Sequence, residues 1–175
     1  MVLGIDPITY THRYSFDKVS DTFLNKYPTP KVPNVTKIEM LKYEETPGGT
    51  YRKRVLTIRN TAPWLFRKLL MNDFISFEEE SVLNEKERTL SIASRNITFS
   101  SFLRASEESK FYVSPENPNW TVFWQDGRVD ASSYCGPLRG PVERLIAPGF
   151  YQSGTESVHI LDDILRDKFG SPFEQ

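Results

Sequence analysis

Apolar and polar residues alternate along much of this chain, and this period of two is that of side chains on a β-strand. Seven stretches show the pattern, and we predict strands over Thr9–Phe16, Val35–Glu44, Thr50–Arg59, Phe74–Leu83, Arg88–Thr98, Leu103–Val113 and Trp120–Ser132. The sequence Thr46-Pro47-Gly48-Gly49 joins the second and third stretches and is a hairpin signal. The strands are therefore expected to form one long antiparallel meander.

Helical spacing of apolar residues occurs in three other places. It predicts helices over Asp17–Tyr27, over Ala62–Met71, and from Val142 past Leu165 with an interruption at Pro148-Gly149. These elements predict one α+β domain, residues 1–175: a strongly curved seven-stranded antiparallel sheet with a long C-terminal helix and two shorter helices. The space enclosed between the sheet and the helices is the expected ligand cavity.

Lys26 lies where the first helix ends. Pro28 and Pro30 cannot continue a helix, because proline lacks the amide donor and biases the preceding residue away from helical geometry. A lysine at a helix C-terminus is favoured by the helix dipole alone. Binding of an anionic ligand is the alternative interpretation, and the local sequence does not choose between them.

Arg54 is the second candidate cation. Alternation places Arg54 on one face of its strand together with Leu56 and Ile58. A guanidinium on a largely apolar, inward face requires a partner. The partner is either an acidic side chain, which would make a structural salt bridge, or an anionic ligand.

Two apolar segments are also open to more than one interpretation. Trp120, Val122 and Trp124 share one face of their strand, and they either pack in the core or form the wall of a cavity. The Ala62–Met71 segment is too apolar for a simple amphipathic helix, so it packs, contacts a membrane or gates a pocket. Its apolar residues are Trp64, Leu65, Phe66, Leu69 and Leu70.

Composition excludes several classes of function. Lys and Arg total 22 against 23 Asp and Glu, so no excess positive charge indicates nucleic-acid binding. Cys135 is the only cysteine, which excludes an internal disulfide. The two histidines, His12 and His159, have no motif partner at catalytic spacing. Three aspartates of the last helix resemble a solvated face, so we expect no enzyme, metal or cofactor; they are Asp162, Asp163 and Asp167.

Six short segments occur in an order that spans nearly the whole chain. They are Lys26-Tyr27-Pro28-Thr29-Pro30, Arg54-Val55-Leu56, Pro63-Trp64, Glu80-Ser81-Val82, Arg95-Asn96-Ile97 and Val142-Glu143. In this order and spacing they resemble the PRELI-like domain family, to which the yeast Ups lipid-transfer proteins and the animal PRELI and slowmo proteins belong.

The resemblance implies a phospholipid carrier. Family members extract one lipid into a gated cavity and carry phosphatidic acid or phosphatidylserine across the mitochondrial intermembrane space, paired with a small twin Cys-x9-Cys helical protein. For this chain the cytoplasm is the alternative location. By position, Lys26, Arg54 and Arg59 would bind the lipid head group, and the Ala62–Met71 segment would be the lid that touches the membrane. The cavity lining would include Tyr27, Leu56, Ile58, Trp120, Val122 and Trp124.

The chain also departs from the family pattern. It has Ile58-Arg59-Asn60-Thr61 where family members commonly carry several lysines, and Ser153-Gly154-Thr155-Glu156 in place of an Asn-x-x-Lys element. Gly149 is a further departure. Only Arg59 replaces the missing cations, and Glu156 would repel a phosphate. The alternative function is therefore a PRELI-like interaction scaffold that has lost lipid transfer.

Overall fold

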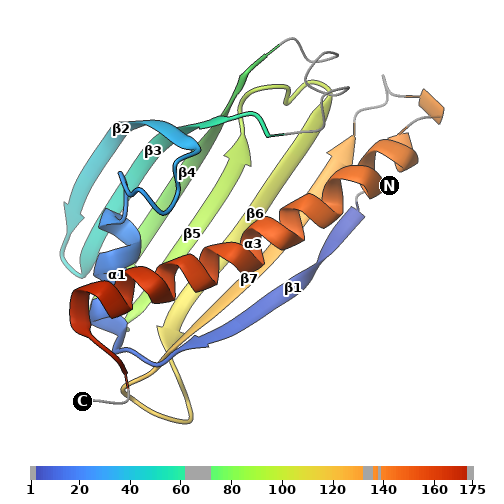
Figure 1. Ribbon diagram of the computed structural model, residues 1–175. Coiled ribbons are helices and arrows are strands. Elements are labelled where there is room, and N and C mark those ends of the chain that lie inside the picture. The colour runs from blue at the N-terminus through green and yellow to red at the C-terminus, as the bar shows by residue number, and fades with distance from the viewer. Residues whose placement is uncertain (1–2, 62–71, 132–135, 138, 173–175) are drawn as a thin grey trace.

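The computed structural model describes residues 3–61, 72–131, 136–137 and 139–172. Within these ranges the chain forms seven strands and two helices (Figure 1). They are β1 (Leu3–His12), α1 (Phe16–Asn25), β2 (Val35–Thr46), β3 (Gly49–Arg59), β4 (Phe74–Asn84), β5 (Thr89–Asn96), β6 (Leu103–Val113), β7 (Thr121–Ala131) and α3 (Arg139–Phe169). The predicted α+β fold, with its seven-stranded antiparallel sheet and long C-terminal helix, is confirmed. The predicted helix Ala62–Met71 lies outside the described residues.

The strands form one sheet in the order β1-β7-β6-β5-β4-β3-β2. From β2 to β7 each strand pairs with the next along the chain, which confirms the predicted meander for these six. β1 differs, because it pairs with β7 and not with β2. The segment that contains α1 therefore carries the chain from one edge of the sheet to the other.

The first predicted strand is displaced from the observed one. β1 begins at Leu3, although Pro7 interrupts its alternation, because an edge strand with a register irregularity between Ile5 and Ile8 tolerates a proline. It ends at His12, and Phe16 instead begins α1 and is buried. Apolar periodicity alone does not separate a strand residue from the first turn of a helix.

The last helix is longer and more continuous than predicted. α3 runs for 31 residues with Pro148 inside it, so the expected interruption at Pro148-Gly149 is wrong. A proline removes one intrahelical hydrogen bond, and a long helix that is held along its length by the sheet can tolerate this loss.

α3 crosses the concave face of the sheet diagonally, and α1 lies beside its C-terminal end (Figure 1). α3 packs mainly against β1 and β7. The hydrophobic core lies at this end of the face, where one row of paired residues is apolar and meets both helices. The row consists of Leu83, Leu90, Phe111, Phe123 and Tyr10, and the helices add Phe16, Val19, Leu24, Val158, Leu161 and Leu165.

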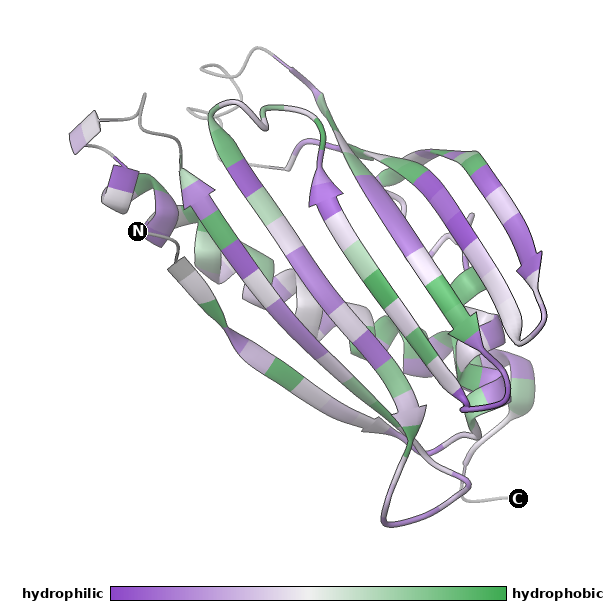
Figure 2. Cartoon of the chain, turned by 180° about the vertical axis from the view of Figure 1, so that it is seen from behind, coloured by the Kyte–Doolittle hydropathy of each residue, from purple (hydrophilic) through white to green (hydrophobic). Residues whose placement is uncertain are grey.

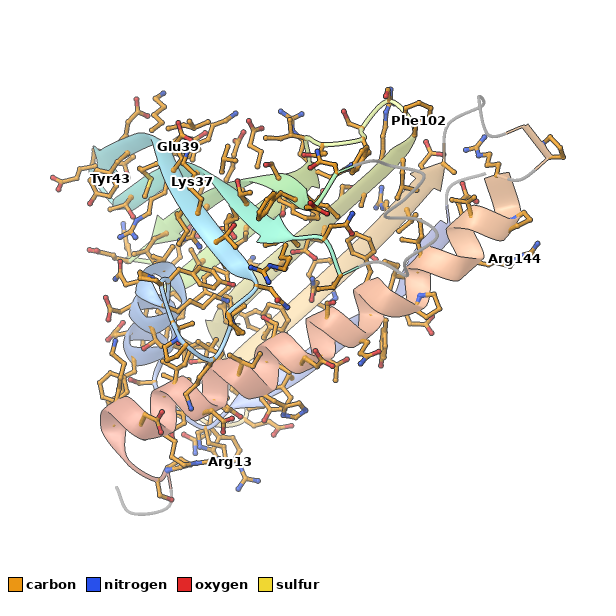
Figure 3. All side chains as sticks on the ribbon, turned by 45° about the horizontal axis from the view of Figure 1, so that its top comes forward. Arg13, Lys37, Glu39, Tyr43, Phe102 and Arg144 are labelled. Atoms are coloured by element: carbon orange, nitrogen blue, oxygen red, sulfur yellow. The ribbon has the colours of Figure 1, made fainter. Side chains whose placement is uncertain are left out.

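Hydrophilic and hydrophobic residues alternate along much of the strands (Figure 2), and successive side chains point to opposite faces of the sheet. At one edge β2 is largely exposed, and Lys37, Glu39 and Tyr43 project from it (Figure 3). Lys37 pairs with Glu39 at 2.9 Å along the strand. Charged side chains on an edge strand disfavour pairing with another chain. Among the described residues, no helix combines the length and the apolar character that a membrane span requires.

Candidate functional site

One row of paired residues on the concave face is charged. Arg54 of β3 lies opposite Glu79 of β4, Glu79 opposite Ser94 of β5, and Ser94 opposite Glu107 of β6. Directly opposed residues of antiparallel strands lie on the same face of the sheet. Arg54 and Glu79 are buried, so the row faces inward. It lies four residues along each strand from the apolar row, since Glu107 and Phe111 are both on β6.

Arg54 is held in a salt bridge with Glu79. Its Nε and Nη2 lie 2.8 and 2.7 Å from the same carboxylate oxygen, and its Nη1 donates to the carbonyl of Leu24 at 3.2 Å. The sequence left two possible partners for Arg54, an acidic side chain or an anionic ligand, and the structure shows the acidic side chain of Glu79. Arg52 also donates to the Leu24 carbonyl, at 3.4 Å, so two arginines of β3 bind the C-terminal end of α1.

Lys26 is the C-cap of α1 and is placed by these contacts above the charged row. Its Nζ lies 4.3 Å from the centre of the Phe23 ring and 5.0 Å from that of Tyr27. Among the described residues it forms no hydrogen bond and no ion pair. Burial lowers the pKa of Lys26 to about 8, with Glu79 and Glu107 acting in the opposite direction. Lys26 is thus an inward cation without a carboxylate partner.

Glu107 is the second charged group of this site that forms no ion pair with a described residue. Burial and the neighbouring Glu79 raise the pKa of Glu107, whereas Gln125 and Lys26 act to lower it. Gln125 Nε2 donates to Glu107 at 2.6 Å, and Gln125 Oε1 is buried with no hydrogen-bond partner. A small cavity of about 10 Å³ lies here between β1, β6, β7 and α3. α3 packs closely here at Gly154, where an added Cβ would lie 2.6 Å from Ile8 Cδ1 and 2.8 Å from Gln125 Oε1.

Apolar residues continue the same face beyond the charged row. Leu56 and Ile58 follow Arg54 on β3 as predicted, and they pair with Phe77 and Ile75 of β4. Leu56 is buried, whereas the other three are partly exposed although they face inward. Tyr27 joins the site through its ring, which lies 5.8 Å from Arg54 Cζ. The predicted lining residues Tyr27, Leu56 and Ile58 are therefore brought together with Lys26 and Arg54.

Three predicted lining residues lie elsewhere. Phe123 packs on Phe111 with ring centres 4.8 Å apart in the core. Its neighbours Val122 and Trp124 therefore belong to the outer face of β7, and Trp120 immediately precedes this strand. The Trp120 ring lies 5.3 Å from Arg13 Cζ. Both faces of this strand are apolar, so the sequence could not show which one turns inward.

Two other predicted features are also remote from the row. Arg59 is exposed at the end of β3, on the opposite face to Arg54 by alternation. Glu156 is exposed on α3 and accepts a hydrogen bond from Gln152 at 2.8 Å, so it does not oppose Lys26. The predicted lid residues Trp64, Leu65, Phe66, Leu69 and Leu70 lie outside the described residues.

Sequence reasoning missed a polar cluster inside the apolar core. Asp162 of α3 accepts a hydrogen bond from Tyr10, and its other oxygen lies 2.6 Å from Nδ1 of the fully buried His12. The expectation that Asp162 belongs to a solvated face is wrong, although Asp163 and Asp167 are exposed. The partners of Asp162 lie about 150 residues away along the chain, and no local pattern indicates them. The strands of Glu79 and Glu107 are nearer to Arg54 in the sequence, but their register is not visible in a local pattern either.

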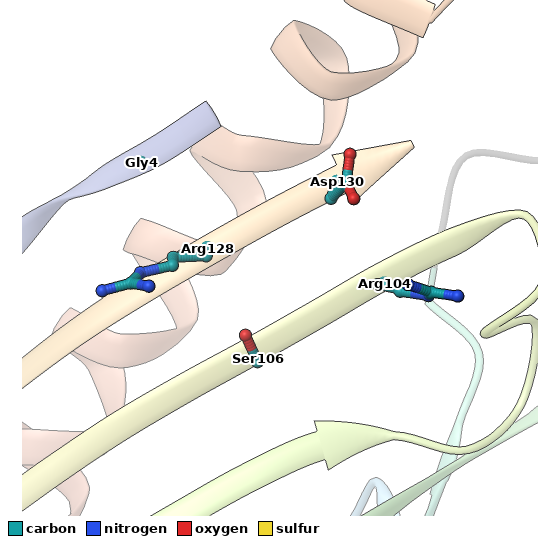
Figure 4. A pocket seen from close by; sticks show the side chains of 5 residues that line it. All are labelled: Gly4, Arg104, Ser106, Arg128 and Asp130. Atoms are coloured by element: carbon teal, nitrogen blue, oxygen red, sulfur yellow. The ribbon is translucent and has the colours of Figure 1, made fainter. Parts of the chain in front are cut away.

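A larger pocket of about 460 Å³ opens on the outer face of the sheet, lined by Gly4, Arg104, Ser106, Arg128 and Asp130 (Figure 4). Arg104 and Arg128 are exposed, and Arg128 lies 3.4 Å from Asp126. Ion pairs in solvent contribute little free energy. The inward charged row is therefore the stronger candidate site.

The chain is similar to known proteins in sequence and in fold. Residues 17–171 match the model of the PRELI-like family. "Protein real-time" of Aedes aegypti is 35% identical over 128 residues, which are 71% of this chain and 20% of that protein. A "Protein slowmo homolog" of Dictyostelium discoideum is 26% identical over 132 residues, 74% of this chain and 58% of that protein. The chain spans about a fifth of the length of the real-time proteins it matches.

Solved structures share the fold. A START superfamily protein from Mycobacterium smegmatis has a TM-score of 0.60 at 13% identity, covering 94% of this chain and 99% of that one. The ZhuI aromatase/cyclase from Streptomyces sp. R1128 has a TM-score of 0.64 at 12% identity, covering 95% of this chain and 94% of that one. At such low identity these similarities concern the arrangement of sheet and helices alone.

Proposed function

Because the chain belongs to the PRELI-like family, we propose that it binds one phospholipid molecule between its sheet and its helices and transfers it between membranes. The proposed cargo is an anionic phospholipid, phosphatidic acid or phosphatidylserine. The proposed location is the mitochondrial intermembrane space, with the cytoplasm as the alternative, and the proposed partner is a small twin Cys-x9-Cys helical protein. No covalent reaction is required, so the chain is proposed to be a carrier and not an enzyme.

Lys26 is the observation that carries this proposal. It is an inward cation whose contacts with described residues are aromatic rings and not carboxylates. A lipid phosphate would give it charge-assisted hydrogen bonds in surroundings of low dielectric constant, where such bonds are strong. Arg54 contributes less, because Glu79 already compensates its charge.

The order of residues along β3 indicates how the proposed lipid would be oriented. Along one face of this strand Arg54 is followed by Leu56 and then by Ile58. A phosphate held at the charged row would therefore leave the acyl chains on the apolar, partly exposed surface beyond it. Burial of that surface by acyl chains is favoured by the hydrophobic effect.

A transfer assay between liposomes tests the head-group assignment. Lys26→Glu should abolish transfer of phosphatidic acid and phosphatidylserine while the circular dichroism spectrum stays native, and Lys26→Arg should keep transfer. Lys37→Glu is the matched control, since Lys37 is exposed on β2. Transfer by Lys26→Glu at the wild-type rate would remove Lys26 from the binding site.

The scaffold function is the second candidate, and two observations favour it. Arg54 already has a protein partner, and the cavity beside Glu107 is about 10 Å³, roughly the room that one water molecule needs. Mass spectrometry of protein purified from cells separates the candidates. One bound phospholipid per chain supports the carrier, and lipid-free protein that still binds a helical partner supports the scaffold.

A further inference from the structure

The charged row contains carboxylates as well as cations, and this composition bears on the choice of cargo. Glu79 is engaged by Arg54, and Lys26 and Glu107 form no ion pair with any described residue. Each shifts the pKa of the other, so they act on one another through the same interior space. A ligand that carries a phosphate alone would satisfy Lys26 and be repelled by Glu107.

We propose that Glu107 and Gln125 bind the ammonium group of the cargo, so that the protein selects a phospholipid whose head group carries a primary amine beside its phosphate. The inference rests on the proposed function of phospholipid transfer and names the specificity of the same site. Glu107 is then a specificity-determining residue, and Lys26 remains the group that binds phosphate.

Two hydrogen-bond acceptors meet at this position. Gln125 donates its amide to Glu107, and the remaining oxygen of Gln125 is buried with no donor. The row neighbour of Glu107 on β5 is Ser94 and that on β7 is Gly127, and neither carries a charge. A primary ammonium brings three N–H donors and one positive charge. It would therefore satisfy the buried oxygen of Gln125 and the carboxylate of Glu107 together.

The same arrangement disfavours two other common head groups. Phosphatidic acid adds only negative charge, which would face both Glu107 and the nearby Glu79. Phosphatidylcholine has a quaternary ammonium with no N–H, so Gln125 Oε1 would stay without a donor and the three methyl groups would need more room than the small cavity gives. A site that hydrogen-bonds an N–H group discriminates strongly against analogues without it.

The test uses the full chain and vesicles that contain, in separate assays, phosphatidylethanolamine, phosphatidylserine, phosphatidic acid or phosphatidylcholine. We expect wild-type protein to transfer the two amine-bearing lipids at least about tenfold faster than the other two. Glu107→Gln keeps the size of the side chain and should reduce this preference about tenfold, largely by accelerating phosphatidic acid. Gln125→Met should also weaken the preference, because it removes the carbonyl oxygen at nearly constant volume.

Glu108→Gln is the matched control, because Glu108 is the exposed neighbour of Glu107 on β6. It should keep the wild-type preference. If folded Glu107→Gln and Gln125→Met both retain the wild-type order of lipids, the assignment of Glu107 is overturned while transfer itself stands. If wild-type protein transfers none of the four lipids, the proposed function falls, and the inference falls with it.

Discussion

Two regions of the concave face are built from the same strands and differ in how their side chains are satisfied. The apolar region, around Leu90, Phe111 and Phe123, is closed by Val158 and Leu165 of α3, and its side chains are almost completely buried. The charged region is the row that contains Arg54, Glu79, Ser94 and Glu107, with Lys26 above it. There, Ser94, Glu107 and Lys26 face inward and keep part of their exposure.

This difference between the two regions suggests different roles, stability for the apolar region and ligand recognition for the charged region. In the apolar region the ionised group is paired, since Asp162 accepts from Tyr10 and contacts His12 Nδ1, although His12 Nε2 and Thr22 Oγ1 are buried with no hydrogen-bond partner among the described residues. In the charged region, Lys26 has no carboxylate partner and Gln125 Oε1 no donor among the described residues. Inward charged groups without an opposite charge are uncommon in folded proteins, and ionisable groups with shifted pKa values concentrate at functional sites. We therefore expect the apolar region to hold the fold together and the charged region to bind the ligand.

Truncation of Phe111 should produce the largest loss of stability. Phe111 is 1% exposed and contacts the rings of His12, Phe23 and Phe123. Phe111→Ala should lower the free energy of unfolding by about 3–5 kcal/mol, because it leaves a cavity in a closed core. Urea denaturation followed by circular dichroism measures this. Ile75→Ala, on the partly exposed surface beyond the charged row, should cost much less; equal losses would contradict the distinction between the regions.

Asp162 should give the next largest effect, because it is the acceptor for two groups in the apolar region. Asp162→Ala should lower the free energy of unfolding by about 3 kcal/mol, since His12 Nδ1 and the Tyr10 hydroxyl lose their acceptor. Burial acts to raise the pKa of Asp162, but the hydrogen bonds from His12 and Tyr10 outweigh it, and the pKa is lowered.

The sign of this shift sets a pH dependence. A carboxylate with a lowered pKa stabilises the folded state above its unfolded pKa, about 3.8, and this contribution is lost as the pH falls below that value. The difference in stability between wild type and Asp162→Asn should therefore shrink as the pH falls from 6 to 3. If this difference in stability is constant from pH 6 to 3, the negative charge of Asp162 does not contribute to stability.

The sequence predicts faces of elements better than it predicts which elements meet. The face shared by Arg54, Leu56 and Ile58 was predicted correctly, because backbone geometry alone sets the period of two. The pairing of β3 with β4 follows from chain order, but the row that joins Arg54 to Glu107 depends on the register of three successive strand pairs. Local patterns do not encode register when several choices keep the apolar face buried.

Helix contacts are predicted less well for the same reason. Asp162 was assigned to a solvated face, since its partners Tyr10 and His12 belong to the first strand and reach it only because β1 pairs with β7. Trp120, Val122 and Trp124 were assigned to the core or to a cavity wall, but Phe123 of the opposite face packs in the core, and the sequence could not distinguish the faces because both carry large apolar residues. Tertiary packing decides such cases, and it is not visible in hydrophobic periodicity.

Lipid transfer should depend on pH through Lys26. Its pKa is about 8, so Lys26 is protonated and holds phosphate below this pH, and it loses its charge above it. Transfer should fall by up to about tenfold per pH unit between pH 8 and 9.5, which is about 1.4 kcal/mol of binding free energy per unit. Lys26→Arg should remove the dependence, because arginine stays protonated over this range. If the transfer rate of the wild-type protein does not change between pH 8 and 9.5, Lys26 does not bind the lipid phosphate.

The smallest expected effect is a gain of stability on substitution of Lys26. Its sign is opposite to that of the losses expected for Phe111→Ala and Asp162→Ala in the apolar region. Burial disfavours the charged form of Lys26, so removal of the charge should stabilise the folded protein. After allowance for partial exposure and for the lost contacts with Phe23 and Tyr27, Lys26→Met should raise the free energy of unfolding by about 0.5–1 kcal/mol at pH 7 while it abolishes lipid binding. Urea denaturation at pH 7 and at pH 9.5 gives the check, since the gain should diminish once wild-type Lys26 is neutral. A loss of stability like that of Phe111→Ala would mean that Lys26 is part of the folded core.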